Sequence, residues 1–105
     1  MNLNEYQEKA MSFALPSAQN LAYMTYGLSG EVGELHSKLA KSIRDGLNGD
    51  AFAPDCIKEV GDVLWFVAGI AKQFNYTLED VAQMNIDKLL SRQQRGTIQG
   101  SGDNR

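Results

Sequence analysis

The 105-residue chain has little of several things that would point to common function classes. Cys56 is its only cysteine and His36 its only histidine, which excludes an internal disulfide framework and the usual Cys/His spacing of a zinc site. Its longest apolar run, residues 63–71, is far shorter than the roughly 20 residues of a membrane-spanning helix. No charged start followed by an apolar run suggests a signal peptide. We therefore expect a cytoplasmic protein without a membrane partner.

The charge balance also excludes a class of partner. The net charge is −3 and the pI is about 5.0, so the chain has no basic footprint and nucleic acid is not an expected partner. A chain of this length supports one core. We expect one helical domain over residues 1–95, followed by a polar, glycine-rich tail at residues 96–105.

Hydrophobic periodicity predicts helices throughout, hence an all-α fold with four helices. Pro16 ends the first helix, residues 45–53 form a loop, and Thr77 with Asp80 resembles a capping box. Asn4 is the expected cap of the first helix and Pro54 the expected start of the third. The predicted ranges are Asn4 to Leu15, Ala18 or Leu21 to Arg44, Pro54 to Phe74, and Thr77 to Gln94.

The third helix is too apolar for one small subunit to cover. Residues 63–71 are apolar on almost every side, and Trp65 and Phe66 point to different sides. A helix that is apolar all round is buried all round. We therefore predict an oligomeric bundle built from identical chains.

Two short segments carry nearly the same acidic motif. Glu31 and Glu34 enclose Val-Gly, and Glu59 and Asp62 enclose Val-Gly again. Residues three apart on a helix share one face, about 4.5 Å apart along the axis. A single such pair is most often a solvated acidic edge, but the duplication at the border of two apolar stripes favours a shared cation site, because four clustered acids repel one another.

The ligand type narrows the choice of cation. Di-iron bundles use Glu-x-x-His pairs, and His36 follows Glu34 by two residues, so it does not fit and is expected to be a packing or surface residue. An all-oxygen site favours Mg²⁺, with Mn²⁺ as a substitute. Gly33 and Gly61 each cost about 1 kcal/mol inside a helix. We expect them to permit close approach of a helix or a ligand.

Basic and amide side chains recur along the predicted fourth helix. Asn85, Lys88, Arg92 and Arg95 follow one another every three or four residues, and this stripe is either a solvated face or a phosphate clamp. Lys38 follows Glu34 by four residues, which is also ordinary helix support. The chain has neither a Walker loop nor a Ser-His-Asp set, so a metal-activated water is the chemistry that remains.

These motifs together resemble the MazG-like all-α nucleoside triphosphate pyrophosphohydrolases. The resemblance rests on Glu-x-x-Glu, a loop, and Glu-x-x-Asp, and it covers nearly the whole chain. The other matching segments are residues 27–34, residues 62–65, residues 85–89, Tyr6-Gln7, and a tail at residues 95–105 similar to that of small bacterial and phage members.

The resemblance implies Mg²⁺-dependent hydrolysis of a (deoxy)nucleoside triphosphate to the monophosphate and pyrophosphate by a dimer or tetramer. A metal-activated water would attack the α-phosphorus, with Glu31 or Glu34 as the base. The implied metal ligands are Glu31, Glu34, Glu59 and Asp62. The implied substrate contacts are Lys38, Asn85, Lys88 and Arg92 for the phosphates and Gln7 near the sugar or base.

Alternatives remain at this point. A dedicated dUTP or dCTP pyrophosphatase and the phosphoribosyl-ATP pyrophosphatase of histidine synthesis are rivals among enzymes. A non-catalytic helical nucleotide-binding or interaction module is a rival of another class, although the four intact acids disfavour it. We also expect the tail to fold back over a nucleotide site, its own or a neighbour's, so that Arg95 or Arg105 meets the substrate's charge.

Overall fold

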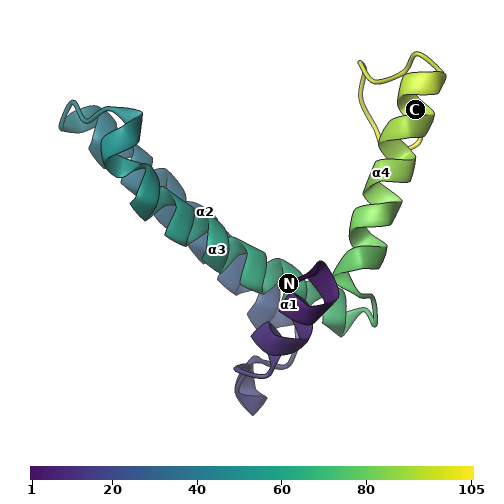
Figure 1. Cartoon of the computed structure of the whole chain (residues 1–105), viewed down its shortest axis with the longest axis horizontal. Coiled ribbons are helices and arrows are strands. Elements are labelled where there is room, and N and C mark those ends of the chain that lie inside the picture. The colour runs from purple at the N-terminus through teal and green to yellow at the C-terminus, as the bar shows by residue number, and fades with distance from the viewer.

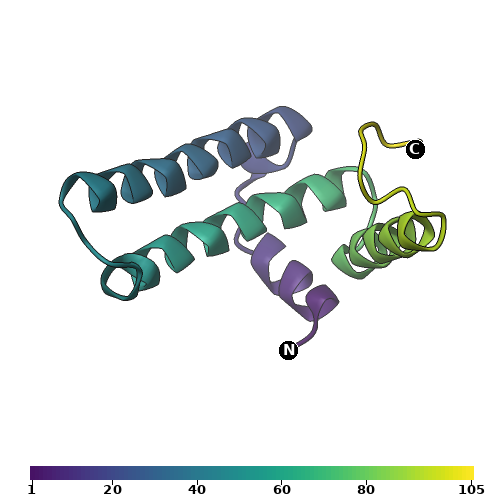
Figure 2. The ribbon, with the colours of Figure 1, turned by 90° about the horizontal axis from the view of Figure 1, so that it is seen from above.

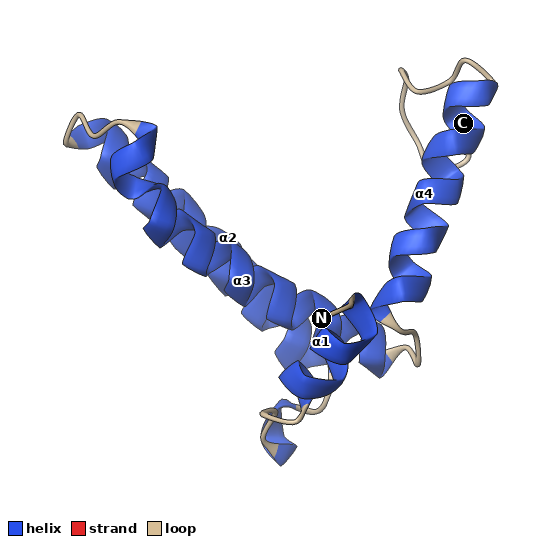
Figure 3. Cartoon of the chain, in the orientation of Figure 1, coloured by secondary structure: helices blue, strands red, loops and turns tan.

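A computed structural model describes the backbone of residues 1–105 and the side chains of all residues except 49–51. The described chain is helical without strands (Figure 3), which confirms the all-α class with four helices. A 3-10 turn, η1, lies between the first two. The elements are α1 (Leu3–Met11), η1 (Pro16–Ala18), α2 (Leu21–Arg44), α3 (Gly49–Gln73) and α4 (Leu78–Gln94).

The first helix differs from the predicted one at both ends. Asn2, not Asn4, caps α1, where its side-chain oxygen accepts from the Glu5 N–H at 2.8 Å. The helix ends at Met11, and the backbone is extended at Leu15, whose ψ is 156°, as expected for the residue before Pro16. The prediction of Leu15 as its end was therefore wrong.

The third helix starts earlier than predicted. It begins at Gly49, so most of the expected loop at residues 45–53 belongs to a helix, and Pro54 lies inside α3. A proline this close to the helix start removes a single intrahelical hydrogen bond. The capping box predicted for α4 is present, since Thr77 accepts from the Asp80 N–H and Asp80 from the Thr77 N–H.

Helices α2 and α3 form an antiparallel hairpin and lie side by side (Figures 1 and 2). Two glycines let them approach closely. A Cβ on Gly27 would lie 2.0 Å from the Phe66 ring, and one on Gly69 would lie 2.3 Å from the Met24 sulfur. The predicted close approach at Gly33 and Gly61 does not occur within this chain, because both positions face open space.

A small core holds α1 against the open end of this hairpin, where α2 begins and α3 ends, near the start of α4. Met24 is the one large side chain that is fully buried among the described residues. Trp65 of α3 donates its ring N–H to the Ala10 carbonyl at 2.9 Å and packs edge-on against Phe66. The core consists of Ala10, Met11, Ala18, Met24, Ala68, Ala71 and Leu78.

Helix α4 leaves this core as a separate arm (Figure 1). It contacts α1 and α3, but α2 has no described contact with it. The radius of gyration is 16.6 Å, whereas a compact chain of this length has about 13 Å. One chain therefore makes a hairpin with an arm, and the oligomeric bundle stays a prediction. No described helix is both long and apolar enough to cross a membrane.

Candidate active site

Three of the four predicted metal ligands come together between α2 and α3. Glu31, Glu59 and Asp62 each offer a carboxylate oxygen, and these oxygens lie within 4.8 Å of one another. We call these three residues the acidic group. Glu31 and Glu59 are partly buried and Asp62 is exposed. The group exists because α2 and α3 are antiparallel, which brings the two Glu-Val-Gly motifs beside each other.

The fourth predicted ligand, Glu34, stands at the edge of this group. Its side chain is exposed and lies outside the cluster of close oxygens, although its charge reaches Glu31. His36 is also exposed, one of the two placements expected for it. The phenol of Tyr6 on α1 has a raised pKa. Burial is the larger cause, and the negative charge of nearby Asp62 is the smaller one.

Lys38 supplies the positive charge at this site. Its Nζ lies 2.8 Å from a Glu59 carboxylate oxygen and 3.3 Å from the backbone carbonyl of Asp55. The hydrogen bond to Glu59 raises the pKa of Lys38, and the same bond lowers the pKa of Glu59. In the chain alone, therefore, the predicted phosphate ligand neutralises one of the acids.

Glu31 carries the unfavourable charge of the site. Partial burial raises its pKa, and the hydrogen bond with Glu59 and the negative charges of Asp62, Glu59 and Glu34 raise it further. A divalent cation would remove this repulsion, and carboxylate oxygens are the ligands that Mg²⁺ takes. The donor set of the acidic group therefore fits such an ion.

The substrate contacts predicted on α4 fall into two places. Asn85 and Lys88 open into a groove of about 450 Å³ that is also lined by Tyr76, Val81 and Met84. None of the four predicted acids lines it. Because α4 diverges from the hairpin, these two residues do not meet the acidic group of their own chain.

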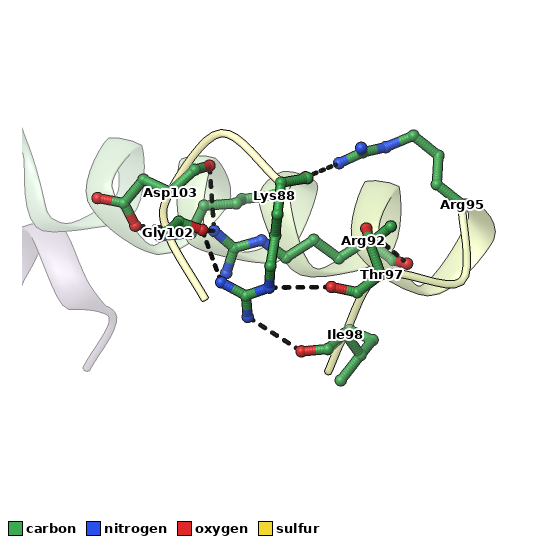
Figure 4. A network of polar contacts seen from close by, with 8 residues as sticks. Lys88, Arg92, Arg95, Thr97, Ile98, Gly102 and Asp103 are labelled. Carbon is green, nitrogen blue, oxygen red and sulfur yellow. Dashed lines mark hydrogen bonds and ion pairs between the residues drawn. The ribbon is translucent and has the colours of Figure 1, made fainter. Parts of the chain in front are cut away.

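Arg92 and Arg95 are engaged by the polar tail (Figure 4). Arg92 is buried and donates to the carbonyls of Gly102 at 3.3 Å and Asp103 at 3.1 Å. Arg95 donates to the carbonyl of Arg105 at 2.8 Å. The tail does fold back as expected, but it folds over the end of α4 and not over the acidic group of its own chain.

Gln7 has a structural position rather than one beside the acids. It is buried, and its amide donates to the carbonyls of Ala68 at 3.2 Å and Tyr76 at 3.1 Å. Its oxygen accepts from the Leu78 N–H at 3.0 Å. The described contacts of Gln7 thus hold α1 to the α3–α4 turn, and the expected place near a sugar or base is not one of them.

Sequence reasoning missed the roles of Asp103 and Arg105. Arg105 donates to three tail carbonyls, and Asp103 lies 3.8 Å from Lys88 and 3.7 Å from Arg92. The signal available was the pair Gly100 and Gly102, which adopt φ of 114° and 87°. Positive φ at both glycines is typical of a turn with a defined shape.

Comparison with known proteins identifies the family. The family model of the MazG nucleotide pyrophosphohydrolase domain matches residues 19–97, which include the acidic group and all of α4. The chain belongs to the MazG family. This match confirms the resemblance, and it supports a hydrolase of the nucleotide pyrophosphohydrolase type.

A phage protein is similar to this MazG chain over its full length. The Gene 37 protein of Mycobacterium phage L5 is 42% identical over 114 aligned residues, which cover 100% of both chains. No solved structure matches the chain significantly.

Proposed function

We propose that this MazG chain hydrolyses (deoxy)nucleoside triphosphates to the monophosphate and pyrophosphate with Mg²⁺. One observation carries the proposal: Glu31, Glu59 and Asp62, from two antiparallel helices of a MazG domain, bring carboxylate oxygens within 4.8 Å of one another. Without a cation this grouping is electrostatically unfavourable, as the raised pKa of Glu31 indicates.

The acidic group would hold the cation, and Mn²⁺ is the expected substitute because it accepts the same oxygen ligands. A bound divalent ion would screen the repulsion between the acids and a triphosphate and would activate a water molecule. Glu34 has no close carboxylate neighbour in the group, so we assign it the role of proton acceptor for the attacking water. Glu31, the other candidate base, is assigned to holding the ion.

The basic residues would receive the negative charge of the substrate. Lys38 is paired with Glu59 at 2.8 Å and can exchange this partner for a phosphate once a cation neutralises the acids. Attack of water on the α-phosphorus releases pyrophosphate, whose charge needs further cations. Lys88 is the candidate for holding the pyrophosphate, because it lines the open groove on α4 together with Asn85.

The first experiment is a screen of the common NTPs and dNTPs for pyrophosphate release, with Mg²⁺, with Mn²⁺ and with a chelator. Chromatography should show a monophosphate and pyrophosphate, and ¹⁸O from labelled water should appear in the monophosphate. A diphosphate and free phosphate as products would refute attack at the α-phosphorus.

Variants of the acids separate their roles. Glu34→Gln should lower turnover at least 100-fold while Mg²⁺ still raises the melting temperature, since ion binding stabilises the folded state. Glu31→Gln and Asp62→Asn should lose both turnover and that stabilisation. Glu8→Gln, an exposed acid on α1, is the matched control and should change neither. Full activity in Glu31→Gln and Asp62→Asn together would overturn the assignment of the site.

A further inference from the structure

Lys38 is the basic residue that pairs with the acidic group among the side chains that the structure describes. It stands on α2, and its side chain reaches across to α3. Its Nζ lies 2.8 Å from a Glu59 carboxylate oxygen and 3.3 Å from the backbone carbonyl oxygen of Asp55. Because Asp55 and Glu59 are four residues apart, the ammonium bridges one turn of α3. Lys38 thus holds Glu59 through two contacts on the same helix.

This ion pair is partly shielded from water. The Glu59 side chain is 12% exposed and the Lys38 side chain is 33% exposed, so the pair is screened less than one on an open surface. Glu59 also shares a hydrogen bond with Glu31. The Glu59 carboxylate therefore lies between the ammonium of Lys38 and a second carboxyl group, and Lys38 is the counter-ion that the acidic group already has.

A divalent ion that binds the acidic group must share Glu59 with this ammonium. Two cations held by the same carboxylate repel each other, and the repulsion is strong where water is partly excluded. As long as Lys38 keeps its place, it therefore weakens the binding of a metal ion. The ammonium ends a flexible four-carbon stem, so it can leave Glu59 without a change in the backbone.

A triphosphate gives Lys38 another place to go. Phosphate oxygens accept strong hydrogen bonds from an ammonium, so an incoming triphosphate competes with Glu59 for Lys38. Once Lys38 turns to a phosphate, Glu59 is free for the metal ion. Binding of the metal and binding of the nucleotide then favour each other, and such coupling has the same size in both directions.

We propose that Lys38 is an internal counter-ion that weakens the binding of a divalent ion by the acidic group alone, so that the metal and the triphosphate enter the site together. Lys38 acts as a positioning residue, because it controls when Glu59 becomes a ligand. The inference rests on the proposed function in taking the acidic group as the nucleotide site, but its effect on the metal alone involves no hydrolysis.

Titration of the full chain with Mn²⁺ alone, followed by the electron paramagnetic resonance of the free ion, tests the counter-ion. Lys38→Met keeps the length and removes the charge, Lys38→Gln keeps a hydrogen-bond donor without the charge, and Lys38→Arg keeps the charge. We expect the Met and Gln variants to bind Mn²⁺ about tenfold more tightly than the wild type, and the Arg variant to bind it as the wild type does. Lys41→Met is the matched control, because it removes an exposed charge one turn further along α2 and should leave the affinity unchanged.

Melting temperatures provide a second measurement on the same variants. Lys38→Met leaves the charge of Glu59 without its partner, so it should melt at a lower temperature than the wild type in a chelator. Mn²⁺ should then raise its melting temperature by more than it raises that of the wild type, because tighter binding stabilises the folded state more. Circular dichroism in the chelator checks that the helices are intact.

The coupling is tested with a dUTP analogue that has a methylene group between the α- and β-phosphates. The wild type should bind the Mn²⁺ complex of this analogue about tenfold more tightly than Lys38→Met does, which is the reverse of their order for Mn²⁺ alone.

Each outcome bears on the proposal. Mn²⁺ binding that is unchanged or weaker in both Lys38→Met and Lys38→Gln would overturn it. Equal binding of the analogue complex by Lys38→Met and the wild type would also contradict it. Tighter binding of Mn²⁺ by both variants, with no binding or hydrolysis of any nucleotide, would support the counter-ion and count against the proposed function alone.

Discussion

A single lysine decides how charge is shared at the acidic group. Lys38 lies 2.8 Å from Glu59 and lowers the pKa of that carboxyl group. The pKa of Glu31 is instead raised, because Glu31 is partly buried and has other acids around it. Two glutamates in equivalent motifs thus have pKa values shifted in opposite directions. Such separation is typical of sites where carboxylates carry different tasks, although ion pairs with a structural role also produce it.

The raised pKa of Glu31 predicts a pH-dependent cost in the cation-free protein. The folded state holds this proton more tightly than the unfolded state, so stability falls as pH rises from the ordinary glutamate pKa through the raised one. Glu31→Gln should therefore melt at a higher temperature than the wild type at pH 7 in a chelator, and the gap should close near pH 4.

The control for this measurement is Glu8→Gln, whose difference from the wild type should not follow that pattern. The contribution of Glu59 to stability has the opposite sign to that of Glu31. Because its pKa is lowered, Glu59 stabilises the fold above the ordinary glutamate pKa, and this contribution is lost as pH falls through the lowered value. If Glu31→Gln melts at a lower temperature than the wild type at pH 7 in a chelator, repulsion among the acids does not destabilise the cation-free protein.

Gln7 gives a second prediction at this scale. Gln7→Leu keeps a similar volume but leaves the Leu78 N–H and the carbonyls of Ala68 and Tyr76 without this partner. A buried polar group without a partner costs about 1–3 kcal/mol, so we expect a loss of stability of about 2 kcal/mol by urea unfolding at fixed protein concentration. A raised KM with unchanged stability would instead indicate that Gln7 contacts the substrate.

At the scale of the helices, two glycines of α2 differ in their surroundings: one packs closely against α3 and the other faces open space. Gly27→Ala would place a methyl group 2.0 Å from Phe66, and overpacking of this kind costs about 1–3 kcal/mol. Gly30 lies one turn away with nothing within 4 Å, so Gly30→Ala gains up to about 1 kcal/mol of helix propensity. Thermal unfolding should move the two melting temperatures in opposite directions, and equal shifts would contradict the close contact between α2 and α3.

Helix existence was predictable because each helix has a local signal. The apolar period, the glycine at the end of α2 with φ of 68°, and the capping box of Thr77 all act within a few residues. The start of α3 was not predictable from Pro54, because proline favours the first turn of a helix, whereas Pro54 lies in the second turn of α3 and removes one hydrogen bond there. Asn4 looked like a cap but bonds to Glu79 across the fold, a contact that no local pattern contains.

At the scale of the whole molecule, the sequence identified the acidic group and left its surroundings open. The two motifs lie at similar distances from the connection between α2 and α3, so antiparallel packing of these helices can bring Glu31, Glu59 and Asp62 together, and their meeting could be predicted. The direction of α4 could not, because its contacts with α1 depend on Gln7 and the turn after α3. That direction is what separates Lys88 from the acids of its own chain.

The open shape leads to a last prediction, that the functional unit contains at least two chains. Light scattering after size exclusion should give at least twice the chain mass of 11.6 kDa. Leu89 is 41% exposed on α4, and Leu89→Glu would bury a charge if α4 packs against another chain of the predicted oligomer. We expect the dissociation constant to rise by about 100-fold, which corresponds to roughly 3 kcal/mol.

The matched control for this variant is Gln94→Glu, which makes the same acidic side chain about 140° around the same helix. It should keep the wild-type mass and activity, whereas Leu89→Glu should lose activity together with assembly and recover part of it at high protein concentration, because the second copy is then restored by mass action. A wild type of 11.6 kDa, or a Leu89→Glu variant of unchanged mass, would show that α4 meets solvent and not another chain.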